Sequence, residues 1–327
     1  MKMKLSKQSG KSRRETAAAA TPPNVQTILA TTDFSEESQA GVRYAVALAE
    51  KLGAGVALVH VVEPRSWMAG MEAVVLARTD AEDAALARAQ LAKLAKSDVG
   101  GDVTVTSSVR TGKPFHEITT AAHEGAADLI VLATRGHTVV ERVLLGSTAE
   151  RVVRHAPCPV LTVPARATPR RAGKTPPFKL KKILVPIDFS NLSKDALPYA
   201  LLLAGHFGAE LVLLHIVELF PIDSLLGREL THQTTVPLMK QAEADLERMA
   251  GELREASGVK ATVVVREGTP FAEICDAAKT GGADLIVITT HGYTGLKHVW
   301  LGSTAERIVR HAPCPVLVVR ELERRTL

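Results

Sequence analysis

The sequence predicts an α/β fold made of two tandem copies of a Rossmann-like domain, each with a five-stranded parallel sheet. The chain has 327 residues, about twice the length of an average domain. Residues 301–319 repeat residues 145–163 with only two substitutions, which indicates an internal duplication. Within each copy, short apolar segments alternate with helix-like ones, as a parallel sheet covered by helices on both faces requires.

Matched positions place the boundaries of the two copies. They recur 155 or 156 residues later in the chain: Asp33 with Asp188, Gly136 with Gly292, and Gly146 with Gly302. A Pro- and Arg-rich stretch separates the copies and predicts a linker. We therefore expect a disordered basic tail at 1–24, a first domain at 25–163, the linker at 164–180, a second domain at 181–320 and a C-terminal tail at 321–327.

Apolar segments predict five strands in each copy. In the first copy they lie at 26–32, 55–62, 103–110, 127–134 and 158–163. In the second copy they lie at 182–188, 210–217, 261–267, 284–290 and 314–319. These segments are apolar throughout, which indicates burial on both faces of a sheet. Parallel sheets of this kind bind ligands beyond the carboxyl ends of their strands.

The segments between the strands predict helices. In residues 35–53 the apolar side chains keep helical spacing, and Gly53 suits the C-terminus of that helix. A long helix rich in Ala, Leu, Glu and Lys is expected over 72–96. Pro114 fits the first turn of the next helix, where its missing N–H is not needed. A short helix is expected from Ser147, and the second copy should repeat the pattern.

The last helix of each copy begins with a Gly-Ser-Thr sequence that has a structural interpretation. Ser147 and Ser303 are expected to be the N-caps of these helices. Glu150 and Glu306 follow three residues later and would complete a capping box. The glycine before each serine would supply the tight turn into the helix.

A functional interpretation of the same sequence includes the loop before it. Two glycines separated by nine residues bracket this loop in both copies: Gly136 with Gly146, and Gly292 with Gly302. Such a loop brings backbone N–H groups and the positive end of a helix dipole to one place, which favours an anion. It is not a Walker loop, because no GxxxxGK[ST] sequence is present.

These residues resemble the universal stress protein family in its tandem, two-domain form. The family pattern is Gly-x2-Gly-x9-Gly-Ser/Thr after the fourth strand, with an aspartate at the end of the first strand, and the resemblance covers nearly all of 25–320. It implies an adenine nucleotide α-hydrolase-like fold, and ATP or a related adenine nucleotide as the ligand, with or without Mg²⁺. It also implies that fifth strands pair, here as an internal pseudo-dimer, and a homodimer is a further option.

The resemblance implies a set of site residues in each half. In the first half the set is Thr32, Asp33, Val56, Ala133, Arg135, Gly136, Gly146, Ser147 and Thr148. In the second half the set is Pro186, Ile187, Asp188, Leu211, Thr289, His291, Gly292, Gly302, Ser303 and Thr304. The aspartates would meet the adenosine end, Val56 and Leu211 would line the base, and the glycine loops would hold ribose and phosphates.

The chain departs from the family pattern at the first glycine of each loop. Ala133 stands there in the first copy and Thr289 in the second. A side chain at this position intrudes where the backbone would approach a ligand, and threonine is bulkier than alanine. This departure favours a second interpretation, in which the loops are degenerate and the protein is a scaffold that binds an unknown regulatory partner.

The charge of the chain argues against nucleic acid as a partner. The whole chain carries a formal charge of +5, residues 1–24 carry +5 and residues 164–182 carry +7, so the remainder carries −7. Aromatic residues make up 4% of the chain, too few for a platform on which bases stack. No run of 18 apolar residues and no signal-peptide pattern occurs, so we expect a cytoplasmic protein without a membrane partner.

Two His–Cys pairs raise the alternative of a zinc site. His155 with Cys158, and His311 with Cys314, have the spacing of paired zinc ligands. If the fifth strands pair antiparallel, as in the family, the two pairs lie at opposite ends, so we expect buried, reduced cysteines and no metal.

No catalytic apparatus is visible in the sequence either. A GxSxG nucleophile elbow is absent. His291 corresponds to Arg135, which cannot take up a proton at neutral pH, so a general base shared by both copies is excluded. We therefore expect a nucleotide-binding regulator first, a scaffold second, and at most slow ATP hydrolysis.

Overall fold

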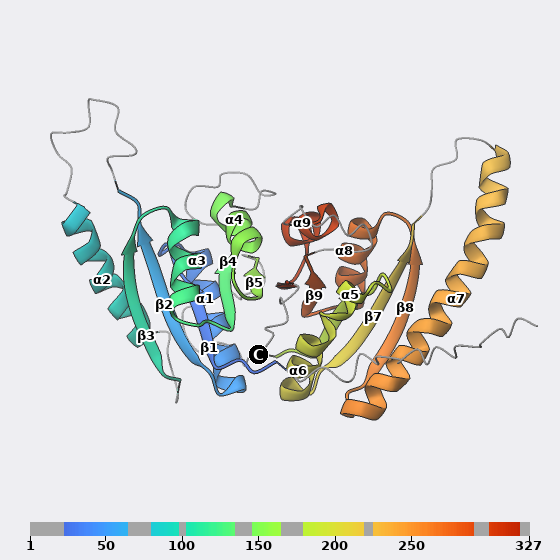
Figure 1. The fold of residues 1–327 in the computed structure, drawn as a ribbon, viewed down its shortest axis with the longest axis horizontal. Helices are drawn as coiled ribbons and strands as arrows, with labels where there is room; N and C mark the ends of the chain where they lie inside the picture. The colour runs from blue at the N-terminus through green and yellow to red at the C-terminus, as the bar shows by residue number, and fades with distance from the viewer. Residues whose placement is uncertain are drawn as a thin grey trace, which may run out of the picture.

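One sheet runs through both halves of the molecule. The computed structural model describes residues 23–64, 80–97, 103–134, 146–164, 179–218, 225–290 and 301–320. Among these residues, ten strands form a single sheet in the order β3-β2-β1-β4-β5-β10-β9-β6-β7-β8 (Figure 1). They are β1 (Thr27–Thr31), β2 (Gly55–Val62), β3 (Val105–Thr111), β4 (Leu129–Ala133), β5 (Val160–Val163), β6 (Lys182–Pro186), β7 (Glu210–Val217), β8 (Ala261–Glu267), β9 (Leu285–Thr289) and β10 (Val316–Val319).

Each half contributes five parallel strands, which confirms the predicted fold class. The strand order reverses at the first strand of each half. β1 lies between β2 and β4, and β6 lies between β7 and β9. In α/β sheets, ligands bind beyond the carboxyl ends of the strands at such a reversal. The ends of β1 and β4, and those of β6 and β9, are therefore the places to look for a site.

Helices cover both faces of the sheet. They are α1 (Glu36–Leu52), α2 (Asp80–Ser97), α3 (Pro114–Glu124), α4 (Ser147–His155), α5 (Asn191–Lys194), α6 (Leu197–Phe207), α7 (Leu225–Ser257), α8 (Pro270–Gly281) and α9 (Ser303–His311). Figure 1 shows α2 and α7 at the two outer flanks and α4 and α9 on either side of the centre. In the described part of the chain, no helix has the length and apolar character needed to cross a membrane.

Two hydrophobic cores lie on opposite faces of the sheet. Ile28 and Ala30 of β1 pack into the core formed with α1, α2, α6 and α7. Leu29, between them, packs into the core formed with α3, α4, α8 and α9. Side chains alternate across a strand, so a strand that is apolar throughout serves both cores. The continuous apolar pattern of the sequence follows from this arrangement.

Local signals explain the bounds of several helices. Ser35 caps α1, because its Oγ accepts a hydrogen bond from the N–H of Ser38 at 3.1 Å. Gly53 ends α1 with a φ of 68°, in the left-handed region that favours glycine. Pro114 lies in the first turn of α3. The predictions for Gly53 and Pro114 are confirmed, whereas the predicted start of α2 at residue 72 lies outside the described residues.

The second half departs from the expected repeat at one helix. The counterpart of α1 is divided into two helices, α5 and α6. Pro198 stands in the first turn of α6. Proline lacks the N–H that a helix interior needs, and its ring clashes with the preceding turn. The chain therefore ends one helix at Lys194 and begins another at Leu197.

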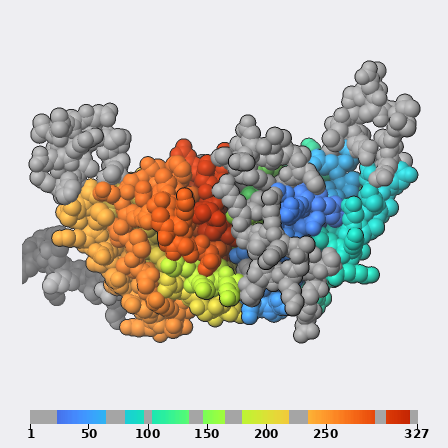
Figure 2. All heavy atoms as spheres, turned by 180° about the vertical axis from the view of Figure 1, so that it is seen from behind, coloured from blue at the N-terminus to red at the C-terminus, as the bar shows by residue number. Residues whose placement is uncertain are grey.

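β5 and β10 join the two halves. They pair antiparallel, and the opposed residues are Thr162 with Val316, Leu161 with Leu317, and Val160 with Val318. All of these side chains are buried. Thr162 donates its hydroxyl hydrogen bond to the carbonyl of Val316 at 3.3 Å, so its polar group has a partner. Figure 2 shows the second half (orange and red) beside the first half (blue and cyan) in one body.

The two His–Cys pairs lie apart from each other, as antiparallel strands require. His155 and His311 are the last residues of α4 and α9. Cys158 and Cys314 are buried, and burial raises the pKa of each thiol to about 12. The prediction of buried cysteines is confirmed for Cys158 and Cys314. Within the described ranges, no group of three or more His, Cys, Asp or Glu residues is arranged to hold a metal ion.

Candidate functional site

A turn that carries an aspartate follows the first strand of each half. Asp33 Oδ1 accepts hydrogen bonds from the N–H of Ser35 at 3.0 Å and from its hydroxyl at 2.5 Å. Asp188 Oδ1 accepts the same two bonds from Ser190, at 3.0 and 2.6 Å. One carboxylate oxygen is thereby fixed in each turn. Both aspartates stand at the strand reversal, where the sequence placed them.

The residue after each aspartate has an unusual backbone conformation. Phe34 has a φ of 67° and Phe189 a φ of 62°. This left-handed region disfavours residues other than glycine, and a non-glycine residue held there costs about 1–3 kcal/mol. Such conformations persist only where the surrounding structure holds them. The turns are therefore defined by contacts and not by backbone preference.

A histidine from the neighbouring strand makes two of these contacts. Nδ1 of His60, in β2, lies 2.8 Å from the carbonyl oxygen of Thr32, and the ring centroids of His60 and Phe34 are 4.3 Å apart. Burial lowers the pKa of His60, so the neutral ring is favoured. The sequence analysis missed this residue, although histidine recurs at the matching position of β7, His215.

The N-termini of α4 and α9, called the helix heads from here on, correct one prediction. The N-caps are Gly146 and Gly302, not Ser147 and Ser303, and neither helix has a side-chain cap. The N–H of Gly146 donates to the carbonyl of Thr134 at 2.8 Å, and its own carbonyl accepts from Glu150 at 3.0 Å. The helix begins at Ser147, so the serine is its first residue and not its cap. Its first N–H groups, which have no partner in the preceding turn, remain available at the carboxyl edge.

The glycines at these heads are not required by the backbone. Gly146 has φ −60° and ψ 141°, and Gly302 has φ −65° and ψ 146°, which any residue can adopt. A Cβ built on Gly146 would meet Thr134 O at 3.4 Å, an ordinary contact. The expectation that glycine supplies a tight turn is therefore wrong. The missing side chain leaves room beside an uncapped helix terminus.

The glutamates of the expected capping boxes have other partners. Glu150 pairs with Arg154 at 2.8 Å and Glu306 with Arg310 at 3.0 Å, each within its own helix. The pairs also cross between the halves, Arg154 with Glu306 at 3.3 Å and Arg310 with Glu150 at 3.9 Å. The carboxylates are drawn toward the joint of the two halves, away from the helix heads.

Val56 and Leu211 lie near the beginnings of their strands and not beside the aspartate turns. Val56 pairs with Ile28, and Leu211 pairs with Ile183, near the beginning of each strand pair. A strand rises about 3.3 Å per residue, so both side chains lie well below the carboxyl edge. Residues from His60 onward in β2 stand closer to Asp33. Sequence alone does not give the register of the strands, so it could not place these two side chains relative to the aspartates.

The other predicted residues divide into two groups. Several lie at strand ends or helix heads near the carboxyl edge: Thr32, Ala133, Thr148, Pro186, Ile187, Thr289 and Thr304. Ala133 ends β4 and is buried, whereas Thr289 ends β9 and is partly exposed. Four predicted residues lie outside the described residues: Arg135, Gly136, His291 and Gly292. The described part of the site thus comprises the aspartate turns and the two helix heads.

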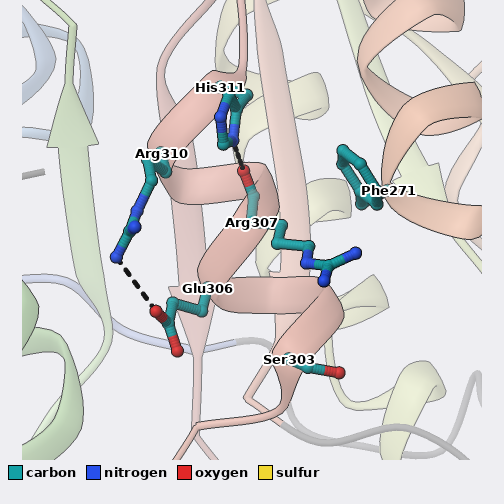
Figure 3. A pocket seen from close by; sticks show the side chains of 6 residues that line it. All are labelled: Phe271, Ser303, Glu306, Arg307, Arg310 and His311. Atoms are coloured by element: carbon teal, nitrogen blue, oxygen red, sulfur yellow. Dashed lines mark hydrogen bonds and ion pairs between the residues drawn. The ribbon is translucent and has the colours of Figure 1, made fainter. Parts of the chain in front are cut away.

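A pocket of about 400 Å³ lies along α9, next to the helix head. Its lining residues are Phe271, Ser303, Glu306, Arg307, Arg310 and His311. Figure 3 shows Ser303 and Arg307 on one side of the helix and Glu306 and Arg310 on the other. The Arg307 guanidinium lies 4.8 Å from the centre of the Phe271 ring, which positions its charge. Ser303 is the residue that this pocket shares with the predicted site.

Comparisons with known proteins agree with the resemblance. The model of the universal stress protein family matches residues 24–164 and 179–320. A universal stress protein of Mycolicibacterium smegmatis is 30% identical over 298 residues, covering 90% of this chain and 96% of its own. Universal stress protein MJ0531 of Methanocaldococcus jannaschii is 37% identical over 141 residues, covering 43% of this chain and 82% of its own.

A solved structure shares the whole fold. The crystal structure of a universal stress protein from Archaeoglobus fulgidus covers 90% of this chain and 96% of its own, with a TM-score of 0.62. The two sequences are 23% identical, so this likeness concerns the fold. It extends over both halves of the chain.

Proposed function

This chain belongs to the universal stress protein family, and we propose that each half binds ATP or a related adenine nucleotide at the carboxyl edge of its sheet. The bound nucleotide, alone or with Mg²⁺, would change the surface that a regulatory protein partner recognises. The proposed domains are residues 25–163 and 181–320, which carry one site each.

The observation that carries this proposal is the head of α4. Neither its φ and ψ nor the space around Gly146 requires glycine, and no side chain caps the helix. Uncapped N–H groups and the helix dipole together favour an anion. A glycine that folding does not need, placed at such a terminus, supports the close approach of a phosphate group.

The aspartate turns support the adenosine end of the same ligand. Asp33 and Asp188 hold one carboxylate oxygen in place through Ser35 and Ser190. A carboxylate is acceptor-only when ionised, so it suits the hydroxyl groups of a ribose. The turn and the helix head stand at the ends of β1 and β4, which are neighbouring strands. A nucleotide would therefore reach from the aspartate turn, at its adenosine end, to the helix head, at its phosphate end.

The scaffold interpretation is the second candidate, because Ala133 and Thr289 replace the first glycine of each loop. Two measurements on the same protein distinguish nucleotide binding from the scaffold interpretation. Gently purified protein is analysed by mass spectrometry for a carried-over adenine nucleotide, and ATP is then titrated calorimetrically into the stripped protein. We expect heat of binding from the wild type.

The matched control uses another glycine. The double variant Gly146→Trp/Gly302→Trp should bind no ATP, because the indole rings fill the space beside both helix heads. Gly205→Trp should bind as the wild type does, since Gly205 is exposed on α6 with nothing within 4 Å of an added Cβ. A wild type without carried-over nucleotide and without heat favours the scaffold.

A further inference from the structure

Each aspartate turn is held on both sides by one histidine. Nδ1 of His60 is 2.8 Å from the carbonyl oxygen of Thr32, and Nδ1 of His215 is 2.7 Å from that of Ile187. A carbonyl oxygen only accepts hydrogen bonds, so Nδ1 carries the proton in both rings. Thr32 and Ile187 are the residues directly before the aspartates.

The same rings contact the residues directly after the aspartates. The centroids of His60 and Phe34 are 4.3 Å apart, and those of His215 and Phe189 are 4.6 Å apart. Both phenylalanines have the left-handed φ described above. Ring contact stabilises a conformation that the backbone alone disfavours. Each histidine therefore fixes the backbone on both sides of an aspartate.

We propose that His60 and His215 are positioning residues, which hold Asp33 and Asp188 in the orientation that the nucleotide requires. The proposal rests on the nucleotide-binding function proposed above. A turn ordered before binding loses less conformational freedom when the ligand arrives, so affinity is higher. The histidines act through the aspartate and need not touch the ligand.

The two turns depend on their histidines to different degrees. In the first half, the hydroxyl of Thr32 accepts from the N–H of Phe34 at 2.9 Å and lies 3.0 Å from the hydroxyl of Ser38. Ile187 replaces Thr32 in the second half and has no side-chain acceptor. The second turn therefore lacks this support. Loss of His215 should harm its site more than loss of His60 harms the first.

Three substitutions at each histidine distinguish the hydrogen bond to the carbonyl from the ring contact with the phenylalanine. Asparagine keeps an N–H donor but removes the ring, phenylalanine keeps a ring but removes the donor, and alanine removes both. The first site is measured in a Gly302→Trp background and the second in a Gly146→Trp background, so that one site is read at a time. The readout is the Kd for ATP by calorimetry.

We expect His215→Ala to raise the Kd of the second site roughly tenfold, and His60→Ala to raise that of the first by about threefold. The asparagine and phenylalanine variants should each recover part of the loss. His206→Ala is the control, because Nδ1 of this exposed histidine also contacts a carbonyl, that of Leu202 at 2.9 Å, but within its own helix. It should leave both Kd values unchanged.

A second readout does not involve the ligand. Amide hydrogen exchange in the nucleotide-free protein should become faster at Phe34, Ser35, Phe189 and Ser190 in the corresponding alanine variants, while the Tm stays within a few degrees of the wild type. A wild type that binds ATP, together with alanine variants of unchanged Kd and unchanged exchange, overturns this proposal alone. A wild type that binds no ATP overturns the proposed function, and this proposal falls with it.

Discussion

At the scale of single residues, the surroundings of His60 set its protonation. Burial lowers the pKa of His60, and the carbonyl of Thr32 and the carboxylate of Asp33 oppose this shift only in part. The unfolded chain therefore binds a proton more readily than the folded one at this position. Its contribution to stability is present above the unfolded pKa of about 6.5 and is lost as the pH falls through the folded pKa.

This linkage predicts how stability changes in mild acid. Between about pH 7 and pH 5, the free energy of unfolding should fall more steeply in the wild type than in His60→Asn, because asparagine does not titrate. Urea denaturation at half-unit pH steps measures the two slopes. His206→Asn, at an exposed histidine, serves as the control and should keep the wild-type slope. Equal slopes for the wild type and His60→Asn would contradict the prediction.

Sequence alone could place the two aspartates at their strand ends but could not show the role of His60. Asp33 and Asp188 follow directly from an apolar strand, so their position at its carboxyl end needed no other information. The role of His60 depends on how β2 lies against β1, and it became visible only with the register. The distance of Val56 and Leu211 from the aspartates along their strands likewise became visible only with the register. The position of an aspartate after its own strand is predictable, whereas the contact of His60 with a neighbouring strand is not.

At the scale of elements, strands were predictable because their apolar runs are bounded by polar residues and glycines. The heads of α4 and α9 were not. Ser147 and Glu150 match the capping-box pattern, yet the carboxylate of Glu150 pairs with Arg154 and with Arg310 of the other half. An ion pair within the helix, at 2.8 Å, and a longer one between the halves, at 3.9 Å, take the place of the capping-box contact. The local sequence contains both the capping-box pattern and the Glu150–Arg154 pair, so it does not decide between them.

The helix heads yield a prediction about stability. Ser35→Ala should destabilise the protein by about 1 kcal/mol, because Ser35 caps α1 through its hydroxyl. Ser147→Ala should change the free energy of unfolding by less than about 0.5 kcal/mol, because Ser147 is exposed and caps nothing. Urea denaturation at neutral pH compares the two variants. Equal losses would mean that Ser147 is a cap after all.

At the scale of the whole molecule, the antiparallel pairing of β5 and β10 explains the repeated sequence. Each of these four-residue strands is fully buried in the joint. A sheet that ended at either strand would expose an apolar edge, which invites pairing with another chain. Near two-fold symmetry lets one sequence serve both sides of the joint. The repetition therefore follows from the way the two halves cover each other.

Separation of the halves tests this interpretation. Residues 1–164 and 179–327, expressed apart, should each self-associate or aggregate, because β5 or β10 would then be uncovered. Size-exclusion chromatography with light scattering gives the mass of each species. Mixing the two halves during refolding should restore a soluble one-to-one pair. If both halves are soluble monomers, the joint is not needed to cover the edges.

The two proposed sites should differ in affinity although their helix heads are identical in sequence. Arg135 in the first half brings a permanent charge, and a charged hydrogen bond contributes about 1.5–3 kcal/mol. His291 stands at the matching position of the second half, and an imidazole has fewer N–H donors than a guanidinium. Ala133 is smaller than Thr289, which leaves more room for the ligand. The first aspartate turn also has the extra hydroxyl support of Thr32.

We therefore expect the first half to bind ATP more tightly. Calorimetric titration of Gly146→Trp should retain only the weaker site, and titration of Gly302→Trp only the tighter one, because each indole ring blocks one helix head. The Tm of each variant is measured beside the titration as the control for folding; at Gly146 the added Cβ makes only an ordinary contact with Thr134 O, at 3.4 Å. Loss of the tighter site in Gly302→Trp instead would reverse the order, and charge and space at these positions would then not decide the affinity.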